Sequence, residues 1–259
     1  MPGSLKRAFP QGLIAAGLMF LGGPALSDGA CQPDQDFAGA RYTICSFGIA
    51  NTDLRLFWRD GAKEPYRTFS AVAEALPGGA VLAFAMNAGM YQEDFRPVGL
   101  YVEDGEQLHA ANTSAGPAGV DPAPNFYKQP NGVFYFGDGT AGVTTTERFL
   151  QGRLKPRYAT QSGPMLVIDG TINPLFIEGS RDRTRRTGVC VAPGGLVTIA
   201  ISEASVNFRD FASLFRDGLG CRDALFLDGG NGVGLYAPAL RRDDRSWHGG
   251  FGPMVGVVE

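Results

Sequence analysis

The sequence predicts an α+β protein in which a mixed, largely antiparallel sheet is flanked by a few helices. Three Asp-Gly pairs, at Asp104, Asp138 and Asp169, each stand between strand-like residues, which is typical of β-hairpins. An apolar stripe at helical spacing runs from Phe208 to Leu219 and predicts one helix packed on a core. No linker, repeat or low-complexity segment divides residues 28–259, so we expect them to form one domain.

Residues 1–27 have the pattern of a secretory signal peptide. A short positive region precedes an apolar run from Leu13 to Leu21, which is too short to span a bilayer, and small residues lead up to a cleavage site near Ser27. A lipid anchor on Cys31 is the alternative, but the three residues before it include no large apolar side chain. We therefore expect a periplasmic or secreted protein that is not inserted in the membrane after signal removal.

The four cysteines all follow the signal, and an even number in an exported protein favours disulfides. Of the three possible connectivities, Cys31–Cys45 with Cys190–Cys221 is the one we expect, because each pair joins neighbouring segments. With two histidines and no CxxC motif, we expect neither a metal nor another cofactor. Lys and Arg are scattered and the net charge is −3, so a nucleic-acid partner is not indicated. The oligomeric state is left open.

Apolar runs and turn residues mark the other elements. In chain order we expect strands at Arg41–Ile49 and Asp53–Trp58, a helix at Thr68–Leu76, strands at Val81–Met86, Val98–Val102, Val133–Phe136, Met165–Ile168, Val189–Val191 and Leu196–Ile201, a helix that begins after Asn207, and strands at Ala224–Leu227 and Met254–Val258. Residues 112–129 and 238–250 are expected to be long loops.

Two buried strands end in a polar side chain followed by small residues. The run Ala224–Leu227 leads into Asp228, Gly229, Gly230 and Asn231, and Val81–Met86 leads into Asn87, Gly89 and Tyr91. Consecutive glycines permit positive φ and close approach of a ligand, although an Asp-Gly pair is also a common turn signal. The repeated pattern favours one shared ligand site.

Other polar residues near strand ends are weaker candidates. Asn131 precedes one strand, and Gln161 and Ser162 precede another. Ser162 is not expected to be a nucleophile, because a G-x-S-x-G elbow and a suitably placed histidine are absent. Arg96 is either a surface cation or a ligand clamp, and the basic run at residues 180–188 is either a solvated loop or an anion site.

These motifs, in this order, resemble the phosphodiester glycosidase family, and most closely its small bacterial periplasmic branch. Residues 87–91 are similar to N-G-G-F-F, residues 186–190 to R-T-A-I-G, and residues 227–233 to L-D-G-G-G-S-S. The resemblance covers essentially all of the chain after the signal. Asn231, Gly232 and Val233 replace the family's usual Gly-Ser-Ser and remove two hydroxyl groups from the presumed ligand loop.

The resemblance implies an exported hydrolase that cleaves the glycosidic bond of a sugar-1-phosphodiester and releases free sugar and a phosphomonoester, in envelope or extracellular glycan metabolism. Asp228 is the first choice and Glu203 the second for the carboxylate near the anomeric carbon, and Arg186 is expected to stabilise the leaving phosphate. The residues then expected to bind substrate are Asn87, Gly89, Tyr91, Arg96, Asn131, Gln161, Ser162, Thr187, Gly229, Gly230 and Asn231. A catalytically silent glycan-binding or envelope-assembly module on the same fold is the alternative. A metal-dependent phosphodiesterase is less favoured, because no ligand-spaced cluster of His and Asp is visible.

Overall fold

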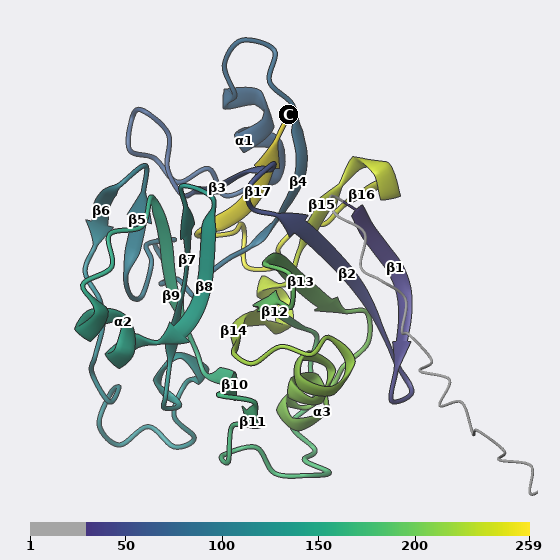
Figure 1. Cartoon of the computed structure of the whole chain (residues 1–259). Helices are drawn as coiled ribbons and strands as arrows, with labels where there is room; N and C mark the ends of the chain where they lie inside the picture. The colour runs from purple at the N-terminus through teal and green to yellow at the C-terminus, as the bar shows by residue number, and fades with distance from the viewer. Residues whose placement is uncertain (1–29) are drawn as a thin grey trace, which may run out of the picture.

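The computed structural model describes residues 30–259, so the predicted signal peptide lies outside the described residues. Every pairing between named strands in this part of the chain is antiparallel, and the strands form three sheets (Figure 1). The predicted α+β class is confirmed, with three antiparallel sheets in place of one mixed sheet.

The seven-stranded sheet carries the candidate site. Its strands are, in spatial order, β1 (Ala30–Phe37), β2 (Ala40–Gly48), β13 (Leu196–Ser202), β12 (Arg186–Ala192), β14 (Ala224–Gly229), β10 (Met165–Ile168) and β11 (Thr171–Ile172). In the register of the central pair, Arg186 lies opposite Gly229, with an irregularity before Gly188.

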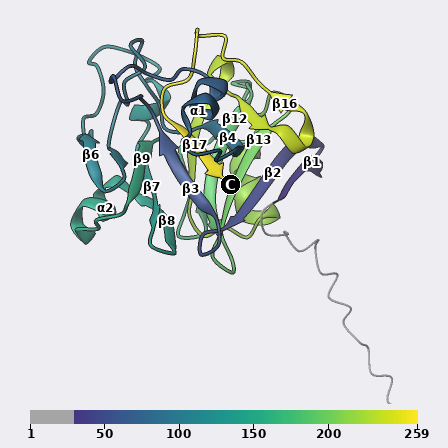
Figure 2. The same cartoon turned by 90° about the horizontal axis from the view of Figure 1, so that it is seen from above.

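The two five-stranded sheets complete the molecule. One has the order β16 (Arg242–Asp243), β15 (Leu235–Ala237), β4 (Leu82–Asn87), β17 (Met254–Val258) and β3 (Asp53–Phe57). The other has the order β6 (Glu106–His109), β5 (Tyr101–Glu103), β9 (Tyr158–Ser162), β7 (Gly132–Gly137) and β8 (Thr140–Thr145). In both views this last sheet lies at the opposite side of the molecule from β1 and β2 (Figures 1 and 2).

The three predicted hairpins are all present. In each turn the Asp has a positive φ, 49° at Asp104, 52° at Asp138 and 49° at Asp169, and the Gly that follows also has a positive φ. Two consecutive residues with positive φ define the type I′ turn, whose twist matches that of the flanking strands.

The helices are short. They are α1 (Phe69–Ala75), α2 (Thr146–Gly152) and α3 (Phe208–Ser213), with a π-helical turn over Leu214–Gly218 and 3₁₀ turns at Asn125–Tyr127, Gly230–Gly232 and Pro238–Leu240. Asn207 caps α3 as predicted, because its Oδ1 accepts from the backbone N–H of Asp210 at 2.8 Å.

Four apolar clusters hold these elements together, and the two largest pack against the seven-stranded sheet. The central one takes side chains from all three sheets, among them Phe47, Phe84, Phe134 and Leu225. The second fills the space between the seven-stranded sheet and α3 and includes Phe226. Opposite faces of β14 therefore pack into different clusters, as expected for a strand buried on both sides.

Both expected disulfides, Cys31–Cys45 and Cys190–Cys221, are present, and the second joins β12 to the segment that leads into β14. Five of the helices and strands were not predicted: β1, β9, β15, β16 and α2. The segment of residues 238–250, predicted to be loop throughout, contains β16 and a 3₁₀ turn.

Candidate functional site

The carboxyl group of Asp228 is the chemically distinctive feature at the end of β14. The four residues before it are fully buried, and Asp228 itself is partly buried. Its Oδ1 accepts from the backbone N–H of Gly229 at 2.7 Å, and within residues 30–259 the carboxyl group forms no ion pair. Burial raises the pKa of this carboxyl to about 7 against the opposing effect of the Gly229 N–H. Asp228 can therefore exchange a proton near neutral pH.

A buried hydroxyl fixes the backbone of Asp228. Thr187 Oγ1 donates to the carbonyl of Asp228 at 3.0 Å and accepts from its N–H at 3.2 Å. Asn87 Nδ2 donates to Thr187 Oγ1 at 2.8 Å, and Asn87 Oδ1 accepts from the backbone N–H of Gly234 at 3.1 Å. Asn87 and Thr187, predicted to bind substrate, thus tie β4 and β12 to the chain on both sides of the glycine-rich loop.

Glycine is favoured at two places in this loop, for different reasons. A Cβ on Gly232 would collide with Oδ2 of Asp228, so the carboxylate occupies space that any other residue would fill. Gly230 has φ +63°, a conformation that L side chains rarely adopt. Gly89 lies just after β4, in the other segment predicted to contribute to the site. A Cβ at this position would collide with Thr160 and with the backbone of Gln161, so close packing accounts for this glycine.

A pocket of about 670 Å³ lies against the loop. Its lining residues are Arg185, Gly230, Asn231, Val233, Asp243, Asp244, Arg245, Ser246 and Trp247. The carbonyl of Asn231 accepts from the hydroxyl of Ser246 and from the N–H of Trp247, both at 3.3 Å, which holds the two walls of the pocket together. The Trp247 side chain is 87% exposed.

Tyr91 lies near the Asp228 carboxyl and near Ser246 in the pocket wall. Its hydroxyl donates to the carbonyl of Gly250 at 3.0 Å, and its ring stacks on Phe95. Burial, and then the nearby charge of Asp228, raise the pKa of Tyr91 to about 12. The predicted proximity of Tyr91 to Asp228 is therefore present, with the hydroxyl engaged by the protein backbone.

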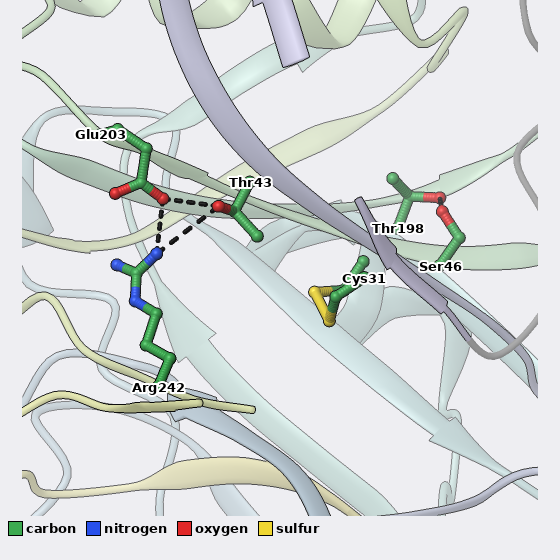
Figure 3. The surroundings of a disulfide bond; sticks show 7 residues. Cys31, Thr43, Ser46, Thr198, Glu203 and Arg242 are labelled. Atoms are coloured by element: carbon green, nitrogen blue, oxygen red, sulfur yellow. Dashed lines mark hydrogen bonds and ion pairs between the residues drawn. A yellow bond between two sulfur atoms is a disulfide. The ribbon is translucent and has the colours of Figure 1, made fainter. Parts of the chain in front are cut away.

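Glu203 belongs to a network of charges at the edge of the pocket. Its Oε1 accepts from Thr43 at 2.6 Å and from Arg242 at 2.5 Å, as Figure 3 shows. Arg242 also binds Asp244 through several N–H groups, and Arg185 lies 3.7 Å from Glu203 and 3.9 Å from Asp244. Glu203 is thus held by two arginines, and Arg185 and Asp244 are the members of the network that line the pocket.

Arg186 does not face the pocket. Its side chain is 1% exposed and lies over Phe208, with 3.6 Å between Cζ and the ring centroid. Nε donates to the carbonyl of Val206 at 2.9 Å and Nη2 to that of Asp182 at 3.2 Å. Arg186 and Asp228 share no ion pair or hydrogen bond, and the guanidinium uses two of its nitrogens to bind backbone carbonyls.

The remaining predicted contacts use their polar atoms within the protein. Gln161 accepts from Leu100 N and Asn112 N and donates to Asn112 O and to Thr146 Oγ1, which itself donates to Asn131 Oδ1. This network secures both ends of the long loop 112–129.

Two predicted residues lie elsewhere. Ser162 donates to the carbonyl of Leu227 at 2.6 Å and so supports β14 beyond the residues that pair with β10. Arg96 is exposed and pairs with Asp94 and Gln92, which matches the surface interpretation.

Sequence reasoning missed Arg185, Asp244, Ser246 and Trp247. Arg185 lies in the basic run of residues 180–188, in which Arg186 was the candidate. The other three lie in residues 238–250, which were interpreted only as loop. The available signal was the density of charged residues with one tryptophan in residues 241–247.

Within residues 30–259, three or more His, Cys, Asp or Glu side chains nowhere gather in a way that could hold a metal ion. In the same residues, the helices fall short of the length and apolar character needed to cross a bilayer.

Comparison with known proteins agrees with the geometry. Residues 80–253 match the phosphodiester glycosidase family, so the chain belongs to that family. It is 31% identical over 176 residues to the uncharacterized protein YigE of Escherichia coli K12, and the matched region is 68% of this chain and 66% of YigE.

Two solved structures share the fold. The catalytic domain of zebrafish N-acetylglucosamine-1-phosphodiester alpha-N-acetylglucosaminidase, auto-inhibited by its pro-peptide, matches with a TM-score of 0.59 and 12% identity over 89% of this chain and 82% of its own. A hypothetical protein from Synechocystis matches with a TM-score of 0.52 and 14% identity over 88% of this chain and 61% of its own.

Proposed function

We propose that this protein is an exported hydrolase that cleaves the glycosidic bond of a sugar-1-phosphodiester. The observation that carries the proposal is the Asp228 carboxyl, which has a pKa of about 7 and no cationic partner and is followed by a loop that lines a pocket. A glycosidic bond breaks through an oxocarbenium-like transition state, which a nearby carboxylate stabilises. Family membership supports this class of reaction.

In the proposed reaction the bond between the anomeric carbon and the phosphate oxygen breaks, and the bonding electrons leave with the phosphate. Water supplies the new hydroxyl group of the sugar, and its second proton is released. Because a phosphate monoester is a far better leaving group than a sugar hydroxyl, its departure requires charge stabilisation more than protonation. Asp228 then acts as nucleophile, as base for water, or as electrostatic stabiliser.

The pocket fits a sugar with polar substituents. Asn231 and Ser246 supply hydrogen-bonding groups, Arg185 supplies a cation, and Trp247 offers an exposed aromatic face against which a sugar ring can stack. We propose a small-molecule or polymeric sugar phosphate as the partner, and no nucleic acid.

We propose that residues 28–259 form the working domain and that residues 1–27 are removed on export to the periplasm or beyond. The two disulfides support an oxidising compartment, because such bonds are rare in the reducing cytosol.

A second candidate function is a catalytically silent glycan-binding module. The substitution of Gly232 and Val233 at positions where the family commonly has serine favours it, because neither residue can supply a side-chain hydroxyl. Val233 lines the pocket but is only 4% exposed, so it presents little surface to a ligand.

The experiment is to incubate the purified mature protein with a panel of sugar-1-phosphodiesters that vary the sugar and the anomer, and to measure free reducing sugar. Turnover of at least one compound, lost in Asp228→Asn and kept in the turn variant Asp138→Asn, supports the enzyme. No turnover together with binding of a glycan by calorimetry would instead establish the binding module.

A further inference from the structure

The guanidinium of Arg185 is held at the pocket without acceptors for its two terminal nitrogens. The side chain is 34% exposed, and Nε donates to the carbonyl of Ser202 at 3.3 Å. Nη2 lies 3.7 Å from Glu203 and 3.9 Å from Asp244, and both distances are longer than a hydrogen bond. Neither terminal nitrogen donates a hydrogen bond within residues 30–259. Donors on both nitrogens are therefore available to a ligand.

Arg242 explains why the two carboxylates leave Arg185 free. Its Nη1 donates to Glu203 Oε1 (Figure 3), and its Nε and Nη2 donate to Asp244 Oδ2 at 3.0 and 2.8 Å. The hydroxyl of Thr43 gives Glu203 a second donor, and a backbone N–H does the same for Asp244. Because Arg242 already binds both acids, Arg185 stays beside them as an oriented cation without a hydrogen-bonded carboxylate.

The pocket that Arg185 lines is beside the Asp228 carboxyl and not around it. The backbone N–H of Gly230 donates to the carbonyl of Arg185 at 2.9 Å, which fixes the arginine to the loop two residues after the acid. Asp228 itself is not one of the residues that line the pocket. The pocket volume of about 670 Å³ falls within the range of roughly 300–1,000 Å³ that is usual for whole ligands. A sugar in this pocket therefore presents to Arg185 a group other than the phosphate that leaves at Asp228.

Recognition in this pocket depends on direction more than on overall charge. The lining contains two arginines, Arg185 and Arg245, and two acids, Asp243 and Asp244, so their formal charges cancel. The planar fork of a guanidinium matches the two oxygens of a carboxylate or a phosphate in paired, charge-assisted hydrogen bonds. An anionic group is thus the ligand that satisfies both free nitrogens of Arg185 at once.

We propose that Arg185 binds an anionic substituent, a carboxylate or a phosphate, on the sugar that the pocket holds. The substrate then carries a negative charge in addition to that of the phosphodiester to be cleaved. Arg242 is a positioning residue, which keeps Arg185 available by holding Glu203 and Asp244. As a statement about the substrate, this inference rests on the hydrolase function proposed above.

The test compares sugars that differ only in one charged substituent. The mature protein is titrated in a calorimeter with glucose, glucuronic acid and glucose 6-phosphate, and with the matching galactose compounds. At least one acidic sugar should bind about tenfold more tightly than its neutral partner, which is the usual size of one charge-assisted contact. The carboxylate and phosphate compounds show which of the two anions Arg185 prefers.

Arg185→Gln should remove this preference, because it weakens the binding of the acidic sugar far more than that of the neutral one. Arg181→Gln is the matched control, since Arg181 is an exposed arginine of the same basic run that does not line the pocket, and it should keep the preference. Equal affinities within every acidic and neutral pair would overturn the proposal. So would the absence of binding by every acidic sugar, or an equal loss for both members of a pair in Arg185→Gln.

The positioning role of Arg242 is tested by rescue. Arg242→Gln releases Glu203 and Asp244 to pair with Arg185, so the preference for the acidic sugar should fall several-fold. Adding Glu203→Gln removes one of the released charges and should restore part of the preference. A second substitution would not repair simple damage to the fold, which circular dichroism and a thermal melt check in each variant. If the double variant recovered no preference, Arg242 would have no positioning role.

The anion site and the hydrolase fail in different ways. A preference for an acidic sugar in binding, with no turnover of any phosphodiester, would leave the anion site intact and refute the hydrolase. Turnover of neutral and acidic sugar phosphodiesters with equal kcat/KM, and no preference in binding, would support the hydrolase and refute the anion site.

Discussion

Buried polar side chains in this protein fall into two regions that use their hydrogen-bonding capacity differently. Around Gln161, the amide oxygen accepts two bonds and the amide nitrogen donates two, all within the protein. At Asp228, one N–H reaches Oδ1, and Oδ2 accepts no hydrogen bond from residues 30–259. Polar groups whose hydrogen bonds are all made within the protein stabilise the fold. A carboxyl group with a free acceptor, next to a loop that lines a pocket, is available to a ligand.

Replacing Asp228 should have the largest effect. We expect Asp228→Asn to lower kcat by about 10³-fold, within the range typical of a positioned acid or base, because the amide can neither take up a proton nor stabilise positive charge. The melting temperature near pH 7 should not fall, since the carboxyl has no cationic partner to lose. Steady-state kinetics and a thermal melt, each with Asp138→Asn in parallel, check both parts. A large drop in stability would instead show that Asp228, like Gln161, has a structural role.

Replacing Gln161 should show the reverse pattern. Gln161→Leu leaves the N–H groups of Leu100 and Asn112 without their acceptor, which we expect to cost about 2–4 kcal/mol of unfolding free energy. The loop 112–129 should become more sensitive to limited proteolysis. Urea unfolding and mapping of the first cleavage sites are the measurements. If the variant instead kept its stability and lost turnover, Gln161 would be a substrate contact after all.

The free energy of unfolding should depend on pH through the titration of Asp228 and Glu103. Glu103, buried beside Tyr101, also has its pKa raised to about 7. An acid whose pKa is raised in the folded state holds its proton longer there than in the unfolded chain. Its stabilisation is complete below about pH 4 and is lost as the pH rises through about 7.

Each group contributes a slope of up to about 1.4 kcal/mol per pH unit in that window. Denaturant unfolding between pH 4 and 8 should therefore give a slope that Asp228→Asn and Glu103→Gln each reduce. If Asp228→Asn left the slope as in the wild type, the raised pKa of Asp228 would be disproved.

The smallest effect is expected for Glu203, the second choice for the catalytic carboxylate. Because two arginines and Thr43 already hold it, Glu203→Gln should cost about 1–2 kcal/mol of stability and lower kcat less than tenfold. Measuring kcat of Glu203→Gln and of Asp228→Asn under the same conditions shows which carboxylate contributes more to turnover. A loss in kcat equal to that of Asp228→Asn would exchange the roles of the two carboxylates.

Local sequence signals predicted much of the fold. Asp-Gly turns specified the hairpins, and Asn207 specified the start of α3, because each rests on the conformational preference of one or two residues. By contrast, β9 reads YATQS, and its polar side chains are buried only because distant segments supply partners, as Asn112 does for Gln161. β1 contains a proline and a register shift, so it has no simple alternation.

The sequence predicted the strand that carries Asp228, but not all the residues that surround the pocket next to it. Asp228 and its glycines were identifiable because a buried strand ends in them. The sequence could not distinguish Arg185, which lines the pocket, from Arg186, which is buried, because neighbouring residues of a strand face opposite sides and the sequence does not say which side is covered. That side is decided by Phe208, which lies in α3, more than twenty residues further along the chain.

The close approach of Gly232 to Oδ2 of Asp228 bears on how this protein is compared with relatives that carry a serine there. A serine introduced at this position would have its Cβ where the carboxyl group now lies, so Gly232→Ser would force the Asp228 side chain to turn away from its present position. An inhibitor shaped to the carboxyl group in its present position should therefore bind the Gly232→Ser variant less well.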